Sequence, residues 1–320
     1  MKMGGSGESR MRISLPFWTT KVPSSRHDDV LLDQLGEIKE NALVDNVTKS
    51  VLRRRVSHHF DRLGDGKGPM ALRDIIRSLV PPILTDFLRG GRALPSWQAA
   101  AAASMGYEDE ALNSFKVKRA AQHKADGSLL ATSMLHLTAL VMGKTDITVT
   151  DLGGSTGDLG RDFLNAFPEA TYTVVENPTM VRMMRGHGSV GFSETVPAAC
   201  DIFFTSGTLQ YLEDPVSIIN QGFASAGFAA ILARNSFCDV ELFRVQRSKL
   251  FDNGSGDIPD GYKNVSLSYP HRTLKESTVR EIAERHGLRC IARIEDRSGV
   301  IPYRGMVYGQ QLVFLRMHRR

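Results

Sequence analysis

The sequence contains little cysteine. Its 320 residues include only Cys200, Cys238 and Cys290, which lie far apart and form no C-x-x-C pair. Zinc sites and disulfide frameworks need cysteines in closely or regularly spaced sets, so this pattern argues against both. We expect three reduced cysteines in the core and predict no metal site.

Long apolar segments are also missing. No run reaches the roughly 18 apolar residues that a membrane-spanning helix needs. Residues 1–9 are rich in glycine, serine and charge, where a secretion signal would carry an apolar core. We therefore expect the protein in the cytoplasm.

The chain lacks the signatures of nucleic-acid binding as well. Its net charge is +5 at pH 7, and its isoelectric point is near 9.1, a balance that can attract anions. However, there is no zinc-finger or helix-turn-helix spacing, and no alternation of aromatic and basic residues typical of an RNA-binding sheet. We do not expect nucleic acid as a partner. The excess positive charge lies before the central motif and at the chain end: Arg53, Arg54, Arg55, Arg73, Arg77, Arg89, Arg92, Arg316, Arg319 and Arg320.

The first part of the chain reads as a tail followed by helices. Residues 1–30 have few apolar positions and are expected to be disordered. Residues 31–140 show helical spacing of apolar residues and are expected to form a helical extension, including helices over 98–105, 111–122 and 129–141. Residues 71–89 are basic, amphipathic and interrupted by Pro81-Pro82. Such a stretch either packs on its own domain or makes a peripheral membrane contact.

The most informative motif lies at residues 147–160. A short apolar strand ends at Asp151, and the turn Leu152-Gly153-Gly154-Ser155-Thr156-Gly157 follows it. Glycine lets a backbone turn tightly and approach a ligand, and the helix N-terminus beyond offers unpaired N–H groups. Gly153-Gly154 does not match the Gly-x-Gly step of the dinucleotide fingerprint. The motif therefore predicts a nucleoside-type cofactor; the alternative is that these glycines only make a turn.

A second acid supports this interpretation. Thr171–Val175 reads as a buried strand that ends at Glu176, close to the offset of about 20 residues at which such folds place a ribose-binding acid. A carboxylate there can accept hydrogen bonds from both ribose hydroxyls. The alternative is that Asp151 and Glu176 are simply polar residues at strand ends.

The rest of the chain alternates strands and helices, which is typical of a doubly wound parallel sheet. Further strands are expected at 190–192, 201–205, 228–233, 288–294 and 310–317, and helices at 158–167, 178–185, 215–224 and 275–286. The short connection before the last strand favours an antiparallel hairpin at the sheet edge. Residues 141–320 would then form one domain, in which the long polar insertion 235–272 acts as a lid over the substrate.

With these motifs placed, the chain resembles a family of class I S-adenosylmethionine-dependent methyltransferases found with bacterial surface-polysaccharide and lipopolysaccharide genes. The resemblance covers about residues 72–317. Its matching blocks are Val80-Pro81-Pro82-Ile83-Leu84, Ser96-Trp97-Gln98-Ala99-Ala100, Gly106-Tyr107, the Asp151–Gly157 turn, and Ser206-Gly207-Thr208-Leu209-Gln210-Tyr211-Leu212-Glu213-Asp214-Pro215. The family usually has Arg-Thr-Pro-Phe after the fifth strand, where this chain has Arg234-Asn235-Ser236-Phe237.

The resemblance implies a Rossmann-like α/β fold with seven strands, the last one antiparallel, and S-adenosylmethionine as cofactor. It implies no particular substrate. In this interpretation Glu176 binds the ribose, the glycine turn faces the methionine part, and Ser193 and Glu194 flank the adenine. The expected cofactor residues are Asp151, Gly153, Gly154, Ser155, Thr156, Gly157, Glu176, Asn177, Ser193, Glu194, Ser206, Gly207 and Gln210.

Methyl transfer from a sulfonium is an in-line displacement, so the protein mainly aligns the reactants and excludes water. A sugar hydroxyl also needs a base or a metal to take its proton. His271 is the best candidate by pKa, and Tyr211 is the second. The alternatives are that His271 is a surface residue in a loop and that Tyr211 only packs.

Three functions remain open from the sequence. The first is methylation of a saccharide or other small molecule; the arginines favour an anionic or phosphate-linked saccharide. The second is a nucleotide-dependent sugar oxidoreductase, for which the expected Tyr-x-x-x-Lys pair is missing. The third is a non-catalytic cofactor-binding scaffold in glycan assembly. The sequence assigns no oligomeric state.

Overall fold

The computed structural model describes residues 92–106, 110–121, 129–254, 256–298, 300–301, 303 and 306–317. The chain divides into two units, Met1–Leu79 and Val80–Arg320, and all described residues belong to the second. The expected tail (1–30), the basic amphipathic stretch (71–89) and the start of the helical extension lie outside the described residues.

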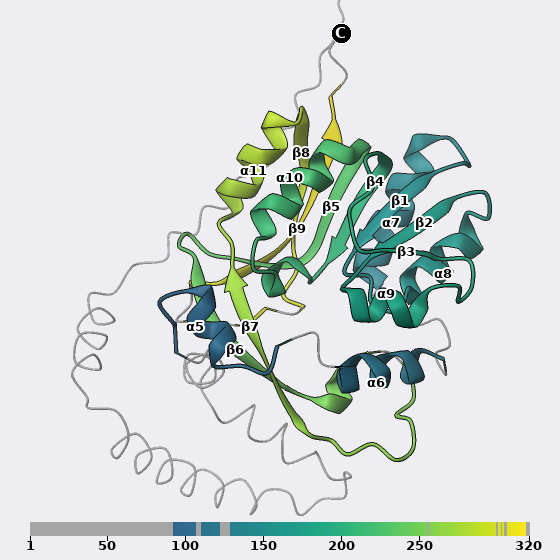
Figure 1. Cartoon of the computed structure of the whole chain (residues 1–320). Coiled ribbons are helices and arrows are strands. Elements are labelled where there is room, and N and C mark those ends of the chain that lie inside the picture. The colour runs from purple at the N-terminus through teal and green to yellow at the C-terminus, as the bar shows by residue number, and fades with distance from the viewer. Residues whose placement is uncertain are drawn as a thin grey trace, which may run out of the picture. The chain divides into compact units, whose positions relative to one another are not determined.

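The centre of the described part is a mixed seven-stranded sheet with the order β3-β2-β1-β4-β5-β9-β8 (Figure 1). Strands β1 to β5 pair in parallel, and β9 is antiparallel to both β5 and β8. This arrangement confirms the predicted α/β sheet with an antiparallel last strand. The strands are β1 (Thr148–Leu152), β2 (Thr171–Val175), β3 (Gly191–Ser193), β4 (Cys200–Ser206), β5 (Ala226–Phe237), β8 (Leu288–Glu295) and β9 (Tyr308–Arg316).

The helices begin where the sequence signals predict. Asn177 and Asp214 are N-caps whose side chains accept hydrogen bonds from backbone N–H groups, and a proline follows each of them in the first turn. This combination satisfies an orphan donor and presets the backbone angle of the first turn. The helices that accompany the sheet are α7 (Leu129–Met142), α8 (Asp158–Ala166), α9 (Pro178–Met184), α10 (Pro215–Ser225) and α11 (Glu276–Arg285).

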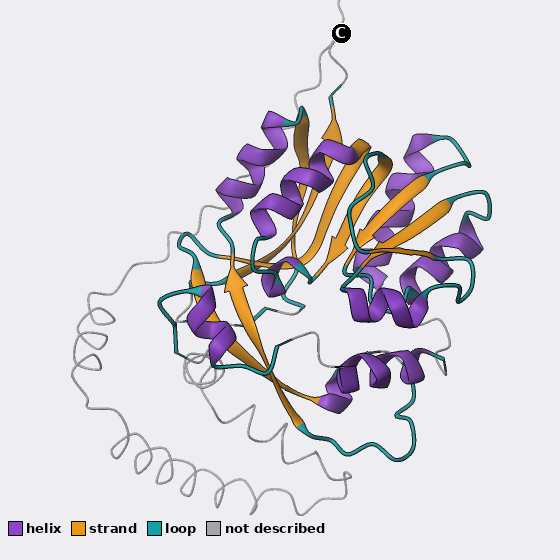
Figure 2. Cartoon of the chain, in the orientation of Figure 1, coloured by secondary structure: helices purple, strands orange, loops and turns teal. Residues whose placement is uncertain are grey.

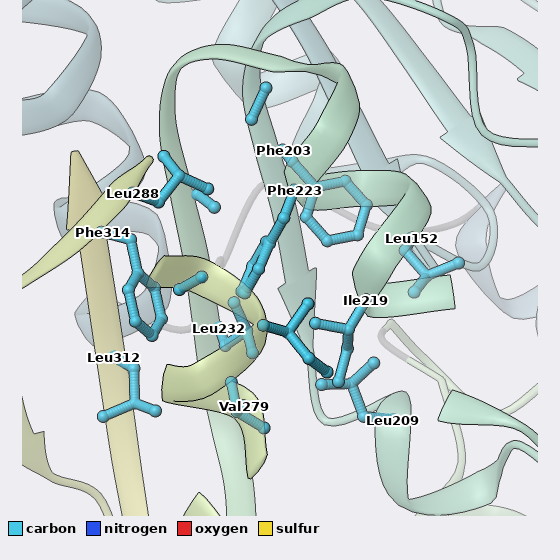
Figure 3. Packing of buried hydrophobic residues seen from close by; sticks show 14 of the residues in the cluster. Leu152, Phe203, Leu209, Ile219, Phe223, Leu232, Val279, Leu288, Leu312 and Phe314 are labelled. Carbon is cyan, nitrogen blue, oxygen red and sulfur yellow. The ribbon is translucent and has the colours of Figure 1, made fainter. Parts of the chain in front are cut away.

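Both faces of the sheet are covered. One face buries Phe203, Leu232 and Leu312 against α10 and α11 (Figure 3). Successive side chains of a strand point to opposite faces, so the neighbouring residues Phe204, Ile231 and Val313 pack on the other side with α7 and α8. Because the strands are apolar on both faces, the polar residues that follow them gather at the ends of the strands.

The insertion after β5 differs from the expected loop. It forms a separate two-stranded antiparallel ribbon of β6 (Leu242–Lys249) and β7 (Ser266–Thr273), as Figure 2 shows. Strand β5 is also longer than expected, because it continues to Phe237 after a shift in its register with β9. The role of the ribbon as a lid stays a prediction.

Two short helices and two 3-10 turns complete the described part. Helix α5 (Trp97–Ala102) packs on both strands of the ribbon, and α6 (Glu110–Ala120) packs on α9. The turn η1 (Leu209–Tyr211) follows β4 and contacts β7, and η2 (Leu250–Asp252) follows β6. None of the described helices combines the length and apolar character that crossing a membrane requires.

Candidate active site

The glycine turn after β1 lies at the point where the strand order reverses. Strand β1 has β2 on one side and β4 on the other, and open α/β sheets bind ligands in the crevice at such a point. Gly153 has a φ of 75°, and a Cβ on it would overlap the Thr208 side chain that follows β4. A Cβ on Gly154 would overlap the Asp151 carboxylate. Both positions therefore require glycine, so the backbone of this turn carries no side chains at these two residues.

Ser155 connects this turn to β2. It has a φ of 53°, in the left-handed region that non-glycine residues rarely adopt. Its backbone N–H donates to Glu176 Oε1 over 3.1 Å. The other non-glycine residue with positive φ among those described is Arg234, with 55°, near the end of β5. Backbone strain of this kind tends to occur at functional sites.

Glu176 is surrounded by donors. Its Oε2 accepts hydrogen bonds from the Asn177 backbone N–H at 2.9 Å and from Asn177 Nδ2 at 2.8 Å. The Glu176 backbone N–H donates to the Ser193 carbonyl, which places the end of β3 beside it. The carboxylate is only partly buried. It is thus fixed in orientation and still has lone pairs for a ligand.

Asp151 lies beneath the turn. It is buried and accepts a hydrogen bond of 2.8 Å from the Tyr172 hydroxyl. Burial raises the pKa of Asp151 to about 7; the hydrogen bond from Tyr172 opposes this shift, and the charge of Glu176 adds to it. Two acids therefore lie close together at the ends of neighbouring strands.

The ends of β4 and β5 form the next wall. The Gly207 backbone N–H donates to the Ala233 carbonyl at 2.9 Å, which joins the two strand ends. Gln210 in η1 is buried, and its Oε1 has no hydrogen-bond partner. The same holds for Asn235 Oδ1 and Ser236 Oγ, at the two positions where the chain departs from the resembling family. Buried polar atoms are nearly always paired, so these three atoms are exceptions. Asn235 and Ser236 are successive residues of β5 and point to opposite faces of the sheet, so the three atoms do not form one group.

The ribbon turns one face toward η1. In the register of the ribbon Arg244 is opposite His271, and the His271 ring lies 5.8 Å from the Tyr211 ring, edge to face. The Tyr211 hydroxyl donates to Gln246 Oε1 at 2.7 Å. The other face of the ribbon packs on α5, where Arg272 lies over the Trp97 ring.

His271 is fully buried, and neither of its ring nitrogens has a hydrogen-bond partner. Burial, and after it the charge of Arg244, lowers the pKa of His271 to about 3. The imidazole is therefore uncharged near pH 7. The alternative suggested by the sequence, an exposed histidine in a loop, is wrong: His271 lies within β7.

Helix α6 contributes residues that the sequence did not single out. Lys116 lies on its buried side, and the charge of Glu176 acts on it. Asn113 is fully buried one turn earlier, and neither atom of its side-chain amide has a partner. The available signal was two polar residues beside Leu112 and Phe115, on the face of the helix where apolar residues are expected.

The structure brings most of the predicted cofactor residues to one edge of the sheet. The glycine turn, Glu176, Asn177 and Ser193 are joined by hydrogen bonds, and Ser206 and Gly207 lie at the end of the adjacent strand. Thr156 is buried and bonds Asp158, and the Glu194 side chain is exposed. The roles of these residues remain predictions.

Other features of the described residues carry no assignment. Cys200 and Cys238 are free and buried, and Cys290 is free and half-buried. Among the described residues, no group of three His, Cys, Asp or Glu side chains is placed to hold a metal ion. A cleft of about 510 Å³ lies beside α11 and β9, and its Glu276 already pairs with Arg280 and Arg293.

The sequence matches no protein-family model and no curated protein. Solved structures with a similar fold include the CcbJ methyltransferase of Streptomyces caelestis, with 14% identity and a TM-score of 0.41 over 64% of this chain and 98% of that one. The magnesium protoporphyrin IX methyltransferase of Synechocystis, solved with bound SAM, is 14% identical with a TM-score of 0.39, over 79% of this chain and 100% of that one.

A further similar structure is a S-adenosylmethionine-dependent methyltransferase from Clostridium acetobutylicum. It is 12% identical with a TM-score of 0.39, and the match covers 58% of this chain and 90% of that one. At such identities and TM-scores the likeness assigns no activity, substrate or site residue to this chain.

Proposed function

We propose that this protein is a class I S-adenosylmethionine-dependent methyltransferase. The observation that carries the proposal is the bond from the Ser155 N–H to Glu176 Oε1. It joins a bare glycine turn to a strand-end acid at the point where the strand order reverses, which is where open α/β sheets bind nucleosides. The antiparallel last strand supports a methyltransferase over a nucleotide-dependent oxidoreductase.

The residues present fit this cofactor. Gly153 and Gly154 form a turn without side chains, as close approach of a ligand to the backbone requires, and Glu176 is partly exposed with lone pairs for ribose hydroxyls. When bound, S-adenosylmethionine supplies an electrophilic methyl group on a sulfonium. The protein then has to hold the acceptor in line with that methyl group and exclude water. The proposed cofactor residues are Asp151, Gly153, Gly154, Ser155, Thr156, Gly157, Glu176, Asn177, Ser193, Glu194, Ser206, Gly207 and Gln210.

We further propose a saccharide hydroxyl as the acceptor, as in the setting of the resembling family. The ribbon offers an uncharged imidazole at His271, and η1, which contacts β7 and β5, offers a phenol at Tyr211 beside it. His271 can accept the hydrogen bond of an acceptor hydroxyl and is the proposed base; Tyr211 is the second candidate. Arg234, near the end of β5, would favour an anionic or phosphate-linked saccharide. Arg272 does not support this assignment, because it lies on the α5 side of the ribbon and bonds the Glu213 carbonyl.

The base assignment is tested by His271→Ala. If His271 takes the proton, kcat falls by roughly 10²-fold to 10⁴-fold, and the acidic limb of the pH–rate profile changes. An active variant with an unshifted profile would remove His271 as base and leave Tyr211, a metal or a bound water. Because a pKa of about 3 makes His271 a weak base, a non-catalytic cofactor-binding scaffold is the second candidate function.

The proposal as a whole is tested by thermal unfolding with S-adenosylmethionine, S-adenosylhomocysteine, NAD and NADP. A ligand that binds the native state raises the melting temperature. At a concentration 100 times its Kd, the ligand increases the free energy of unfolding by about 2.7 kcal/mol. We expect this increase with the two adenosyl compounds only. A larger increase with NAD would contradict the proposal. Binding without methyl transfer to any saccharide, small molecule or protein would favour the scaffold.

We also propose a cytoplasmic location. The three cysteines of the chain are free, as expected for a reducing compartment. Peripheral membrane contact through residues 71–89 remains a proposal about a segment outside the described residues. Vesicle sedimentation with anionic and neutral lipids tests it.

A further inference from the structure

Helix α6 contacts two elements that follow it much later in the chain, α9 and the ribbon. It packs on α9, the helix that begins directly after Glu176 and Asn177 (Figure 1). On its other side Leu112 and Phe115 pack with Leu250, Leu267 and Tyr269 of the ribbon region. Helix α6 thus connects the region after β2 with the ribbon.

The side of α6 that faces inward is polar at its centre. At 100° per residue, Lys116 lies between Leu112 and Ala120 on the buried face. Burial lowers the pKa of Lys116, while the charges of Glu176 and then Tyr269 raise it. The packing of α6 on α9, which begins directly after Glu176 and Asn177, brings this face of the helix to the same strand end.

Asn113 lies one turn before Lys116, next to Leu112 on the helix. Its side chain is 0% exposed, and both its amide nitrogen and its amide oxygen lack a partner. A buried amide without partners lowers the free energy of unfolding by about 1 to 3 kcal/mol, and neither helix propensity nor packing offsets this loss. The neighbouring buried positions of α6 are filled by Leu112, Phe115 and Ala120, so packing alone does not call for an amide.

We propose that α6 forms the roof of the cofactor site: the Asn113 amide binds the nucleoside half of the ligand, and Lys116 positions Glu176 for the ribose. This inference rests on the proposed function. A carboxamide both donates and accepts, so it complements the edge of an adenine or a ribose hydroxyl. Lys116 acts through Glu176 and is a positioning residue.

The test measures calorimetric affinities for S-adenosylhomocysteine and for 5′-methylthioadenosine, which lacks the amino-acid part. Asn113→Ala should weaken both ligands by a similar factor of at least about five. The melting temperature of the ligand-free protein should stay equal or rise, since the variant removes an unpaired buried amide. Lys118→Met, an exposed position on the same helix, serves as control and should leave both affinities unchanged.

A second variant tests Lys116. Lys116→Met should weaken binding, and in the Glu176→Ala background the same change should have much less effect, because the lysine acts through that acid. Equal effects in both backgrounds would exclude the positioning role.

The outcomes separate this inference from the proposed function. If wild-type protein binds neither adenosyl ligand, the proposed function fails. If it binds and Asn113→Ala binds equally well, the function stands and the roof assignment falls. A loss of S-adenosylhomocysteine affinity with unchanged 5′-methylthioadenosine affinity would move Asn113 to the methionine half and overturn the nucleoside assignment.

Discussion

Glu176 combines two tasks in one side chain. It holds the Ser155 N–H of the glycine turn, and it is the proposed acceptor for the ribose hydroxyls. Glu176→Ala should therefore weaken S-adenosylhomocysteine by about 1.5 to 3 kcal/mol, roughly tenfold to 150-fold, the range for a hydrogen bond to a charged group. Calorimetry measures this. Glu284→Ala, at an exposed position of α11, is the matched control, and unchanged affinity in Glu176→Ala would remove the ribose assignment.

Folding shifts the pKa values of Asp151 and His271 in opposite directions. The pKa of Asp151 is raised from 3.8 to about 7, mainly by burial, so its stabilising effect is complete below pH 3.8 and is lost as the pH rises through 7. The pKa of His271 is lowered from 6.5 to about 3, also mainly by burial, so its contribution is present above pH 6.5 and is lost as the pH falls toward 3. Between pH 7 and 5 the two effects oppose each other.

Single variants should separate these two effects. We compare the change in unfolding free energy when the pH falls from 7 to 5. Relative to the wild type, this change should be about 2 kcal/mol less favourable in Asp151→Asn and about 2 kcal/mol more favourable in His271→Phe. Urea unfolding at the two pH values measures both changes. A His271→Phe profile parallel to the wild type would show that His271 is not buried as an uncharged group.

Among the elements, the ribbon depends on side chains that bind backbone. Arg119 of α6 donates to the carbonyls of Phe251, Asn253 and Gly256 at 2.7 to 2.9 Å. Arg272 of β7 donates to the Glu213 carbonyl before α10. Arg119 thus holds residues 250–256, which follow β6 and which we call the turn of the ribbon, against α6. Arg272 holds one end of β7 against the chain after η1.

Arg119→Ala should loosen the turn of the ribbon without disturbing the sheet. Three carbonyls lose a charged donor, so we expect a loss of about 1 to 3 kcal/mol, reduced where water replaces the donor. Hydrogen exchange should become faster around residues 250–256 and stay unchanged in β1 and β4. Arg182→Ala removes an exposed arginine of α9 and is the control; equal exchange in the two variants would argue against this anchoring role.

The sequence predicted the sheet well and the ribbon poorly. The strands of the sheet are continuous apolar runs bounded by caps and glycines, and these signals are local. In β6 and β7 the buried face carries Arg244 and His271, and the opposite face carries Phe243, whose ring lies under Arg272. Polar residues inside and an aromatic residue on the α5 side hide the two-residue period, so the segment read as a polar loop. The polar side of α6 was missed because Asn113 and Lys116 occupy buried positions of the helix, where apolar residues are expected.

At the scale of the whole molecule, the candidate site is assembled from four separate stretches of the chain. The glycine turn and Glu176 come from the first two strands, η1 follows β4, the ribbon lies between β5 and α11, and α6 precedes the sheet (Figure 1). In the proposed site the ends of the strands lie on one side of the ligand, α6 forms the roof and the ribbon lies beside it. We therefore expect specificity for an acceptor to depend on elements that the sheet does not need in order to fold.

This arrangement predicts the effect of removing residues 1–30. Every residue assigned here to the cofactor site lies between Asn113 and Gln210, and the proposed bases are Tyr211 and His271. A chain that starts at residue 31 should therefore keep its melting temperature and its affinity for S-adenosylhomocysteine. Calorimetry and thermal unfolding of the two chains, side by side, measure both. Loss of affinity with an unchanged melting temperature would make the tail part of the site and overturn the proposed division of the chain at residue 30.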